Sequence, residues 1–136
     1  MSDKDRSCCR GGTKVILACC GASNVGQLTN EVAKRLDGDG EARFFCLAGV
    51  GGHVSGMVAS VKGADEVLVL DGCPVACAKE CMDEAGLPDY QHVVMTELGI
   101  EKNHEFNLSD AEMTKALAAC RRALNDSDRP SGGGAG

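Results

Sequence analysis

The stretch KVILACCGASNVGQLTNEVAKRL, residues 14–36, decides the fold. Its first seven residues, KVILACC, are apolar on both faces, which is typical of a central strand in a parallel sheet covered by helices. Ser23 can cap a helix whose apolar stripe runs from Val25 to Leu36, and the Asp-Gly pair at residues 37–38 supplies its end. The segment therefore predicts a strand followed by an amphipathic helix, the unit from which α/β proteins are built.

The same alternation continues along the chain. Residues 43–50, 66–71 and 91–98 are predicted strands, and residues 54–62 a short helix. Pro74 predicts a further helix start with Cys73 as its cap, and Ser109 with Glu112 forms a capping box for the last helix. We predict one three-layer α/β domain over residues 13–125, Rossmann- or flavodoxin-like, between flexible tails at residues 1–12 and 126–136. Its mostly parallel four-stranded sheet has the expected order 2-1-3-4.

Composition narrows the possible functions. The chain has 136 residues, a formal net charge of −6 and nine cysteines. The negative charge opposes binding to nucleic acid or to an anionic membrane, because both need clustered Lys and Arg. The first residues contain no apolar signal region, and no run approaches the roughly 18 apolar residues of a membrane span, so we expect a cytoplasmic protein. In that reducing compartment, many cysteines indicate metal binding or thiol chemistry.

Most of the cysteines follow the predicted strands. Cys19 and Cys20 end the first strand, Cys46 lies towards the end of the second, and Cys73 and Cys77 follow the third. The carboxyl ends of parallel strands share one edge of the sheet, where ligands bind. Thiolates from distant segments could therefore meet around one ion, as a tetrahedral zinc site requires.

Cys73, Cys77 and Cys81 are spaced to share one face of a helix. They cannot all bind one zinc ion, because Cys73 and Cys81 would be about 12 Å apart along the helix axis. The pair Cys73 and Cys77 is nearer the loop edge, where the start of a helix favours thiolates. We therefore predict Cys81 as a core residue, and Cys120, which lies in an apolar stripe, as another.

The remaining candidates carry less signal. His53 lies in a glycine-rich loop and could be a zinc ligand or a proton carrier, although a simple loop histidine is the more usual case. His92 and His104 give still weaker indications. Cys8 and Cys9 lie in the predicted N-terminal tail, where we interpret them as accessory thiols.

Three motifs nearly match other functions. GASNVGQL has the glycine spacing of a phosphate-binding loop, but Gln27 and Leu28 replace its Lys and Ser or Thr. A low-molecular-weight phosphatase would need Arg where Val25 or Gly26 stands, six residues after a cysteine. In GVGGHVSG, Val54 replaces the third glycine of a dinucleotide fingerprint. None of these functions is supported.

The sequence resembles the DGC-domain proteins, a family associated with zinc binding and named for a central Asp-Gly-Cys. The resemblance rests on DGCPVACAKE at residues 71–80, together with CCGASNVGQL, FCLAGVGGHVSG and TELGIEKNH. The family pattern has four chelating cysteines, which by motif correspond to Cys19, Cys46, Cys73 and Cys77. A Cys-Ser-Gly-Ala order is usual in the family's first motif, so Cys20 stands here in place of serine.

Three hypotheses follow. The first is a zinc-binding protein that uses Cys19, Cys46, Cys73 and Cys77 for metal storage, sensing, delivery or structural support. The second is a thiol redox or sulfur-transfer enzyme, with Cys73 or Cys20 as nucleophile and Cys77 as resolving thiol, or with Cys19 and Cys20 as the reactive pair. The third is an iron–sulfur cluster, which four thiolates also hold. The expected partner is a metal ion.

Overall fold

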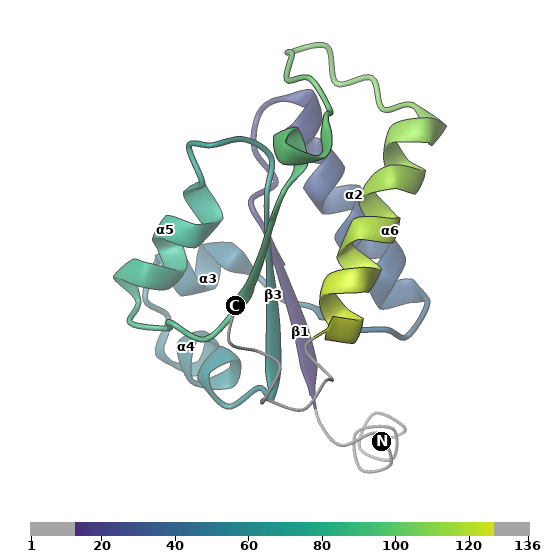
Figure 1. Cartoon of the computed structure of the whole chain (residues 1–136). Coiled ribbons are helices and arrows are strands. Elements are labelled where there is room, and N and C mark those ends of the chain that lie inside the picture. The colour runs from purple at the N-terminus through teal and green to yellow at the C-terminus, as the bar shows by residue number, and fades with distance from the viewer. Residues whose placement is uncertain (1–12, 127–136) are drawn as a thin grey trace.

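The computed structural model describes residues 13–126, so the predicted tails, apart from Asp126, lie outside the described residues. The strands are β1 (Lys14–Ala18), β2 (Arg43–Phe44), β3 (Glu66–Asp71) and β4 (Gln91–Val94). The helices are α2 (Asn24–Gly38), α3 (Leu47–Gly51), α4 (Ser55–Lys62), α5 (Cys77–Glu84), the 3₁₀ helix η1 (Met95–Leu98) and α6 (Asp110–Asp126). All strand pairs are parallel, in the order β2-β1-β3-β4, which confirms the predicted topology (Figure 1).

The sheet lies between two layers of helices. Helices α2 and α6 cover one face, and α3, α4 and α5 cover the other (Figure 1). Side chains alternate between these faces along each central strand: Ile16 and Leu68 pack with α2 and α6, whereas Val15 and Val69 pack towards α4 and α5. Burial on both faces explains why KVILA and EVLVL are continuously apolar.

Two helix starts confirm the capping predictions. The Ser23 hydroxyl accepts a hydrogen bond from the Gly26 amide at 3.0 Å at the start of α2. In the capping box of α6, the Glu112 amide donates to the Ser109 hydroxyl at 3.1 Å, and the Ser109 amide donates to the Glu112 carboxylate at 3.5 Å. These local contacts satisfy amides that have no partner within the helix.

The second predicted strand is too long. Pairing ends after Phe45, whose amide still donates to Ile16 O at 2.9 Å, and residues 47–51 form α3 instead. Gly49 and Gly51 explain the change, because Cβ atoms there would lie 2.8 Å from Met57 Cγ and 3.1 Å from Cys81 Sγ. Close packing of α3 against α4 and α5 thus overrides the apolar strand pattern.

Pro74 does not start a helix, and Cys73 is not a helix cap. The Ala76 amide donates to Cys73 O at 3.0 Å, which makes residues 73–76 a turn before α5 begins at Cys77. The fixed φ of proline suits the second position of a β-turn as well as it suits the first turn of a helix, so the motif was ambiguous.

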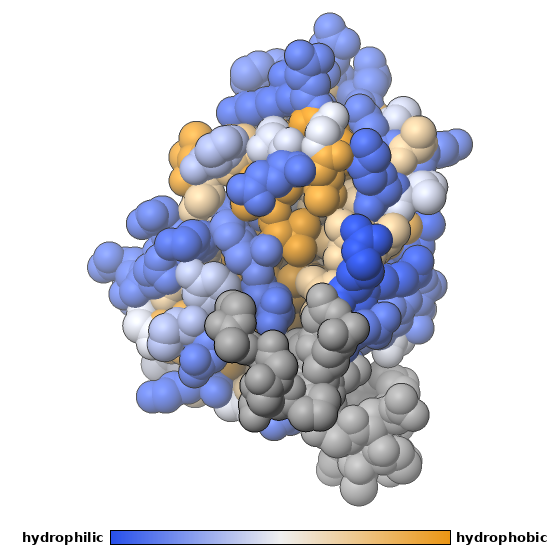
Figure 2. Space-filling view, viewed as in Figure 1, coloured by the Kyte–Doolittle hydropathy of each residue, from blue (hydrophilic) through white to orange (hydrophobic). Residues whose placement is uncertain are grey.

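The first and fourth strands also end earlier than predicted. Cys20 leaves extended backbone with φ 52°, and residues 95–98 form η1 rather than strand. The Thr96 amide donates to Gly72 O at 3.1 Å, which holds η1 beside the turn that follows β3. Figure 2 shows hydrophobic residues in the middle of the face on which β4 lies, with hydrophilic residues on both sides. Within residues 13–126, no helix is long and apolar enough to cross a membrane.

Candidate metal centre

The predicted ligand cysteines all follow the carboxyl ends of neighbouring strands. Cys19 comes directly after β1 and stays beside β3, because its amide donates to Leu70 O at 3.0 Å. Cys46 occupies the cap position of α3. Cys73 lies in the turn after β3, and Cys77 is the first residue of α5. One edge of the sheet therefore carries all four thiols.

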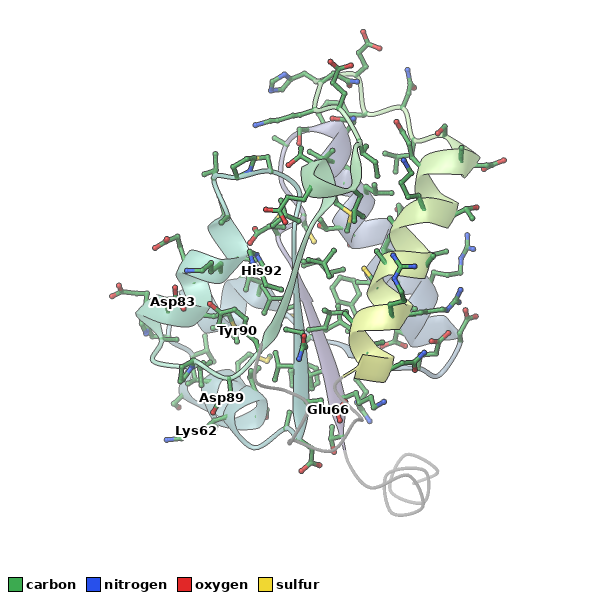
Figure 3. All side chains as sticks on the ribbon, in the orientation of Figure 1. Lys62, Glu66, Asp83, Asp89, Tyr90 and His92 are labelled. Carbon is green, nitrogen blue, oxygen red and sulfur yellow. The ribbon has the colours of Figure 1, made fainter. Side chains whose placement is uncertain are left out.

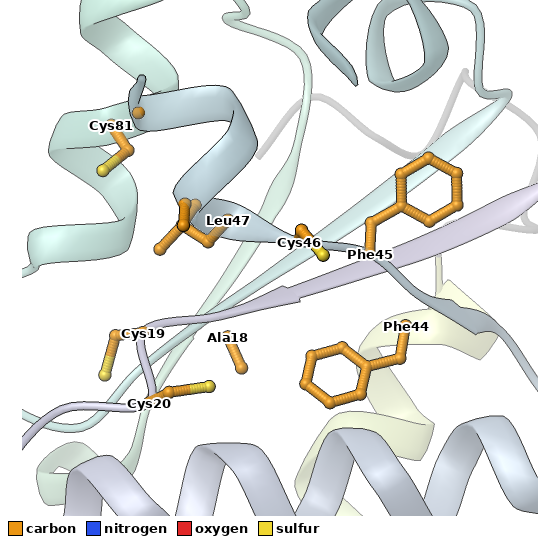
Figure 4. Close-up of a pocket in the computed structure, with 10 residues that line it drawn as sticks. Ala18, Cys19, Cys20, Phe44, Phe45, Cys46, Leu47 and Cys81 are labelled. Atoms are coloured by element: carbon orange, nitrogen blue, oxygen red, sulfur yellow. The ribbon is translucent and has the colours of Figure 1, made fainter. Parts of the chain in front are cut away.

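A pocket of about 600 Å³ opens at this edge (Figure 4). Four of its lining residues are cysteines: Cys19, Cys20, Cys46 and Cys81. The others carry no charge and no polar side-chain atom: Ala18, Phe44, Phe45, Leu47, Ala48 and Gly51. The pocket thus brings together two predicted ligands, Cys19 and Cys46, and adds two thiols outside the predicted set.

The prediction that Cys81 is a core residue is wrong. Cys81 is only partly buried and lines the pocket from α5. Its sulfur fits because Gly51 has no side chain on the facing part of α3. Cys120 on α6, in contrast, is fully buried as predicted, and burial raises the pKa of its thiol to about 12.

Cys73 and Cys77 do not lie on the pocket wall. Cys73 is partly buried, with its sulfur 3.5 Å from Lys102 Nζ, and Cys77 is exposed. Within the part of the chain that the structure describes, no three His, Cys, Asp or Glu side chains are grouped closely enough to hold one metal ion. The four predicted ligands therefore share an edge but form two groups, one in the pocket and one on residues 73–77.

Asp71 fixes the position of Cys77. This carboxylate is buried, and it accepts hydrogen bonds from the amides of Ala78 at 2.7 Å and Lys79 at 3.0 Å. It therefore caps α5 from outside the helix, where the N-cap residue Ala76 has no polar side chain. Sequence reasoning missed this role, because the capping carboxylate precedes the helix by a whole turn of chain.

His92 completes the surroundings of Asp71. Its Nε2 lies 2.8 Å from Asp71 Oδ2, so the buried carboxylate contacts an imidazole as well as the start of α5. The neighbouring Tyr90 hydroxyl donates a hydrogen bond to Asp83 of α5 at 2.8 Å. The rings of Tyr90 and His92 contact each other edge to face, and both lie beside α5 (Figure 3). Sequence reasoning assigned His92 little weight, because the local spacing of residues does not reveal its contact with Asp71.

Asn24 anchors the loop that carries Lys102. Its side-chain amide donates to Glu101 O at 2.8 Å, and its carbonyl oxygen accepts the Asn103 amide at 2.6 Å. The intervening Lys102 is thereby held over the Cys73 thiol. Neither Asn24 nor Lys102 was predicted as a site residue. The available signal was their presence in the motifs GASNVGQL and TELGIEKNH.

The backbone is strained next to two predicted ligands. Cys20 has φ 52° and Ala76 has φ 56°, so each occupies the left-handed region that disfavours residues with a Cβ atom. Cys20 follows Cys19, and Ala76 precedes Cys77. Strain of this kind persists where the surrounding structure imposes it, commonly at functional sites.

The pocket thiols outside the predicted set are poorly ionised. Burial raises the pKa of Cys20, and the neighbouring Cys19 thiol raises it further. Burial also raises the pKa of Cys81, followed by the influence of Cys77 and Asp71. Both groups therefore favour the neutral thiol near neutral pH when no cation is present. This argues against Cys20 as an activated nucleophile.

His53 and His104 add little to this edge. His53 is exposed with φ 59° and is not on the pocket wall, and His104 is exposed on the loop before α6. Their geometry agrees with the expectation that they are loop residues.

Comparison with known proteins identifies the family. Residues 15–120 match the DGC domain. The chain belongs to the DGC-domain family. It is similar to the anaerobic and virulence modulator AnvM of Pseudomonas aeruginosa strain PAO1, with 38% identity over 100 residues, which is 72% of this chain and 76% of that protein. No solved structure matches the chain.

The motif that names the DGC family has a physical explanation in this member. Asp71 caps α5, and Gly72 allows the turn to pack against α2, since a Cβ there would lie 2.8 Å from Gly26 N and Val25 C. Cys73 carries the thiol beside Lys102. In this DGC domain, two residues of the motif therefore build the turn and the third presents a thiol.

Proposed function

We propose that this DGC domain is a zinc-binding protein whose ligands are Cys19, Cys46, Cys73 and Cys77. The observation that carries the proposal is the placement of all four thiols at the carboxyl edge of β1, β2 and β3. Four thiolates match the donor preference of tetrahedral zinc, and family membership supports a metal-related role.

Binding requires the two groups of thiols to approach each other. Residues 73–76 form the short connection that would carry Cys73 towards the pocket, while Asp71 holds the backbone of Cys77 at the start of α5 and only its exposed side chain would turn. A bound zinc ion would cross-link the segments that follow β1, β2 and β3. Its four thiolates leave a net charge near −2, which Lys102 Nζ, 3.5 Å from Cys73 Sγ, and the amides at the start of α5 can offset.

The exposure of the ligands favours metal sensing or delivery over a purely structural role. Cys46 and Cys77 are exposed, so a bound ion would be accessible to exchange. The name of the relative AnvM describes that protein as a modulator, which is compatible with a regulatory use of metal here.

Zinc content of untagged protein tests the proposal. We expect one zinc ion per chain in the wild type, and at least about a tenfold loss of affinity in Cys19→Ala and Cys77→Ala. The double variant Cys8→Ala/Cys9→Ala, which removes two thiols outside the predicted set, is the matched control and should keep its zinc. Wild-type protein without zinc, or equal loss in the control, would contradict the proposal.

A second candidate function is thiol–disulfide exchange, which the contact between Lys102 and Cys73 favours. A nearby cation stabilises the thiolate that acts as nucleophile. The Cys73 thiolate would attack a substrate disulfide and release one thiol. Cys77 would then displace the second thiol, which leaves Cys73 and Cys77 oxidised and the substrate reduced by two electrons.

Alkylation rates separate the two candidates. In the zinc protein, Cys73 and Cys77 react slowly until a chelator is added, whereas a nucleophilic Cys73 reacts rapidly without chelator. We expect the first behaviour. In Lys102→Met, a fall in the Cys73 rate with no effect of chelator would instead support the enzyme.

A further inference from the structure

The pocket contains two thiols that the proposed zinc site does not use. Cys20 reaches its wall from the end of β1, and Cys81 reaches it from α5. Together with Cys19 and Cys46, they place four sulfurs from three separate segments around one cavity (Figure 4). Such a set is unexpected for a purely structural role, because two of the four, Cys20 and Cys46, are exposed.

The rest of the wall selects for a soft occupant. Among the described residues, no charged, imidazole or amide side chain lines the pocket, and the largest neighbours of the thiols are Phe44, Phe45 and Leu47. Hard cations such as Mg²⁺ and Ca²⁺ prefer carboxylate and other oxygen ligands, which no side chain of the wall supplies. Thiolates in apolar surroundings suit soft metals and iron–sulfur clusters.

The pocket has room for an occupant larger than one ion. Its volume of about 600 Å³ lies in the range of sites for small molecules and cofactors. Among the described residues, no three candidate ligands are close enough to hold one metal ion. An occupant that binds all four sulfurs would have to bridge them, and in a [4Fe–4S] cluster each thiolate binds a different iron atom.

We propose that this pocket is a binding site for an iron–sulfur cluster, ligated by Cys19, Cys20, Cys46 and Cys81. Four thiolates are the usual ligands of [2Fe–2S] and [4Fe–4S] clusters. The site is distinct from the proposed zinc site but shares Cys19 and Cys46 with it. The two occupants therefore exclude each other, and neither proposal depends on the other.

Gly51 also lines the pocket, next to Cys81. A Cβ at this position would lie 3.1 Å from Cys81 Sγ, so this sulfur packs directly against Gly51. Gly51→Ala keeps every thiol but would shift the Cys81 sulfur by a few tenths of an ångström. It should weaken cluster binding without changing the number of cysteines.

The test is anaerobic reconstitution of the full chain with ferrous iron and sulfide, followed by iron and sulfide analysis and Mössbauer spectroscopy. We expect one cluster per chain in the wild type. Cys20→Ala and Cys81→Ala should reduce cluster content at least about tenfold, and Gly51→Ala should reduce it less. Gly56→Ala, at a position with nothing within 4 Å of the added Cβ, is the matched control for the glycine change.

The zinc ligands supply the decisive control. Cys73→Ala and Cys77→Ala should retain the cluster, and circular dichroism should confirm that all variants are folded. When the variants are loaded with zinc instead, Cys73→Ala and Cys77→Ala should lose zinc, whereas Cys20→Ala and Cys81→Ala should keep it. Failure of the wild type to form a cluster, or equal loss in the Cys73 and Cys20 variants, would overturn the cluster proposal. Loss of the zinc pattern alone would overturn only the zinc proposal.

Discussion

The turns that follow β1 and β3 both connect a buried strand to a helix at the candidate site, but the two helix starts are capped in different ways. Each leads from a buried strand to a helix beside a predicted ligand, Cys19 in one and Cys77 in the other. The first helix is capped locally by Ser23, whereas the second is capped by Asp71 from the far side of the turn. The local cap uses a residue of the turn itself, whereas the remote cap spans the turn and holds its two ends together.

The difference bears on function, because the remote cap leaves residues 72–76 without a capping duty. Ala76, where a capping side chain would normally stand, adopts the left-handed conformation instead. The connection between Cys73 and Cys77 can therefore change shape while α5 remains anchored through Asp71. This is the movement that the proposed zinc site requires.

The largest expected effect comes from the point where the turn after β3 packs against the first turn of α2. In Gly72→Ala, the added Cβ would lie 2.8 Å from backbone atoms of Gly26 and Val25, which cannot move independently of α2. We expect the free energy of unfolding to fall by about 3 kcal/mol in urea titrations. The control Gly56→Ala has free space in α4 and should be neutral or slightly stabilising. Equal stabilities of the two variants would show that the turns are not tightly packed.

The two caps should differ in strength. Asp71→Ala leaves two helix amides and His92 without their acceptor, so we expect a loss of about 2 kcal/mol. Ser23→Ala removes one hydrogen bond and should cost about 1 kcal/mol. Asp71→Asn, which keeps an acceptor oxygen, should lie between Asp71→Ala and the wild type. A larger loss in Ser23→Ala would reverse the comparison.

The smallest effect concerns the strained alanine. Ala76→Gly removes the steric penalty of φ 56° but adds flexibility to the unfolded chain, so we expect a net gain of about 0.5 kcal/mol. Ala85→Gly, at a residue with φ −82° at the other end of α5, should instead lose about 0.5 kcal/mol. Thermal denaturation of both variants checks the order. If Ala76→Gly lowered the stability as much as Ala85→Gly, the left-handed conformation of Ala76 would not be strained.

Local patterns predicted the sheet well. Continuous apolar runs identified β1 and β3 as central strands, and the Ser23 and Ser109 caps were correct because each acts within its own helix turn. Residues 46–50 were misjudged because contacts of Gly49 and Gly51 with distant side chains decide their conformation. The start of α5 was misplaced for a similar reason: Pro74 fits two structures, and Asp71 selects between them.

The sequence predicted that the candidate site lies at the carboxyl edge of the sheet, but not which side chains meet there. Strand order placed Cys19, Cys20, Cys46, Cys73 and Cys77 at the carboxyl ends of the strands, and the family resemblance selected Cys19 rather than Cys20. It could not show that Cys81 turns towards the pocket, since helical spacing does not reveal which neighbour a face meets. The contacts of Asn24 with residues 101–103 and of Lys102 with Cys73 join segments far apart in sequence, and no local signal encodes them.

The most direct test of the central claim is X-ray absorption at the zinc edge on untagged protein purified without oxygen. We expect one zinc ion per chain with four sulfur neighbours at about 2.3 Å. A first shell of nitrogen or oxygen atoms, or a protein without zinc, would contradict it.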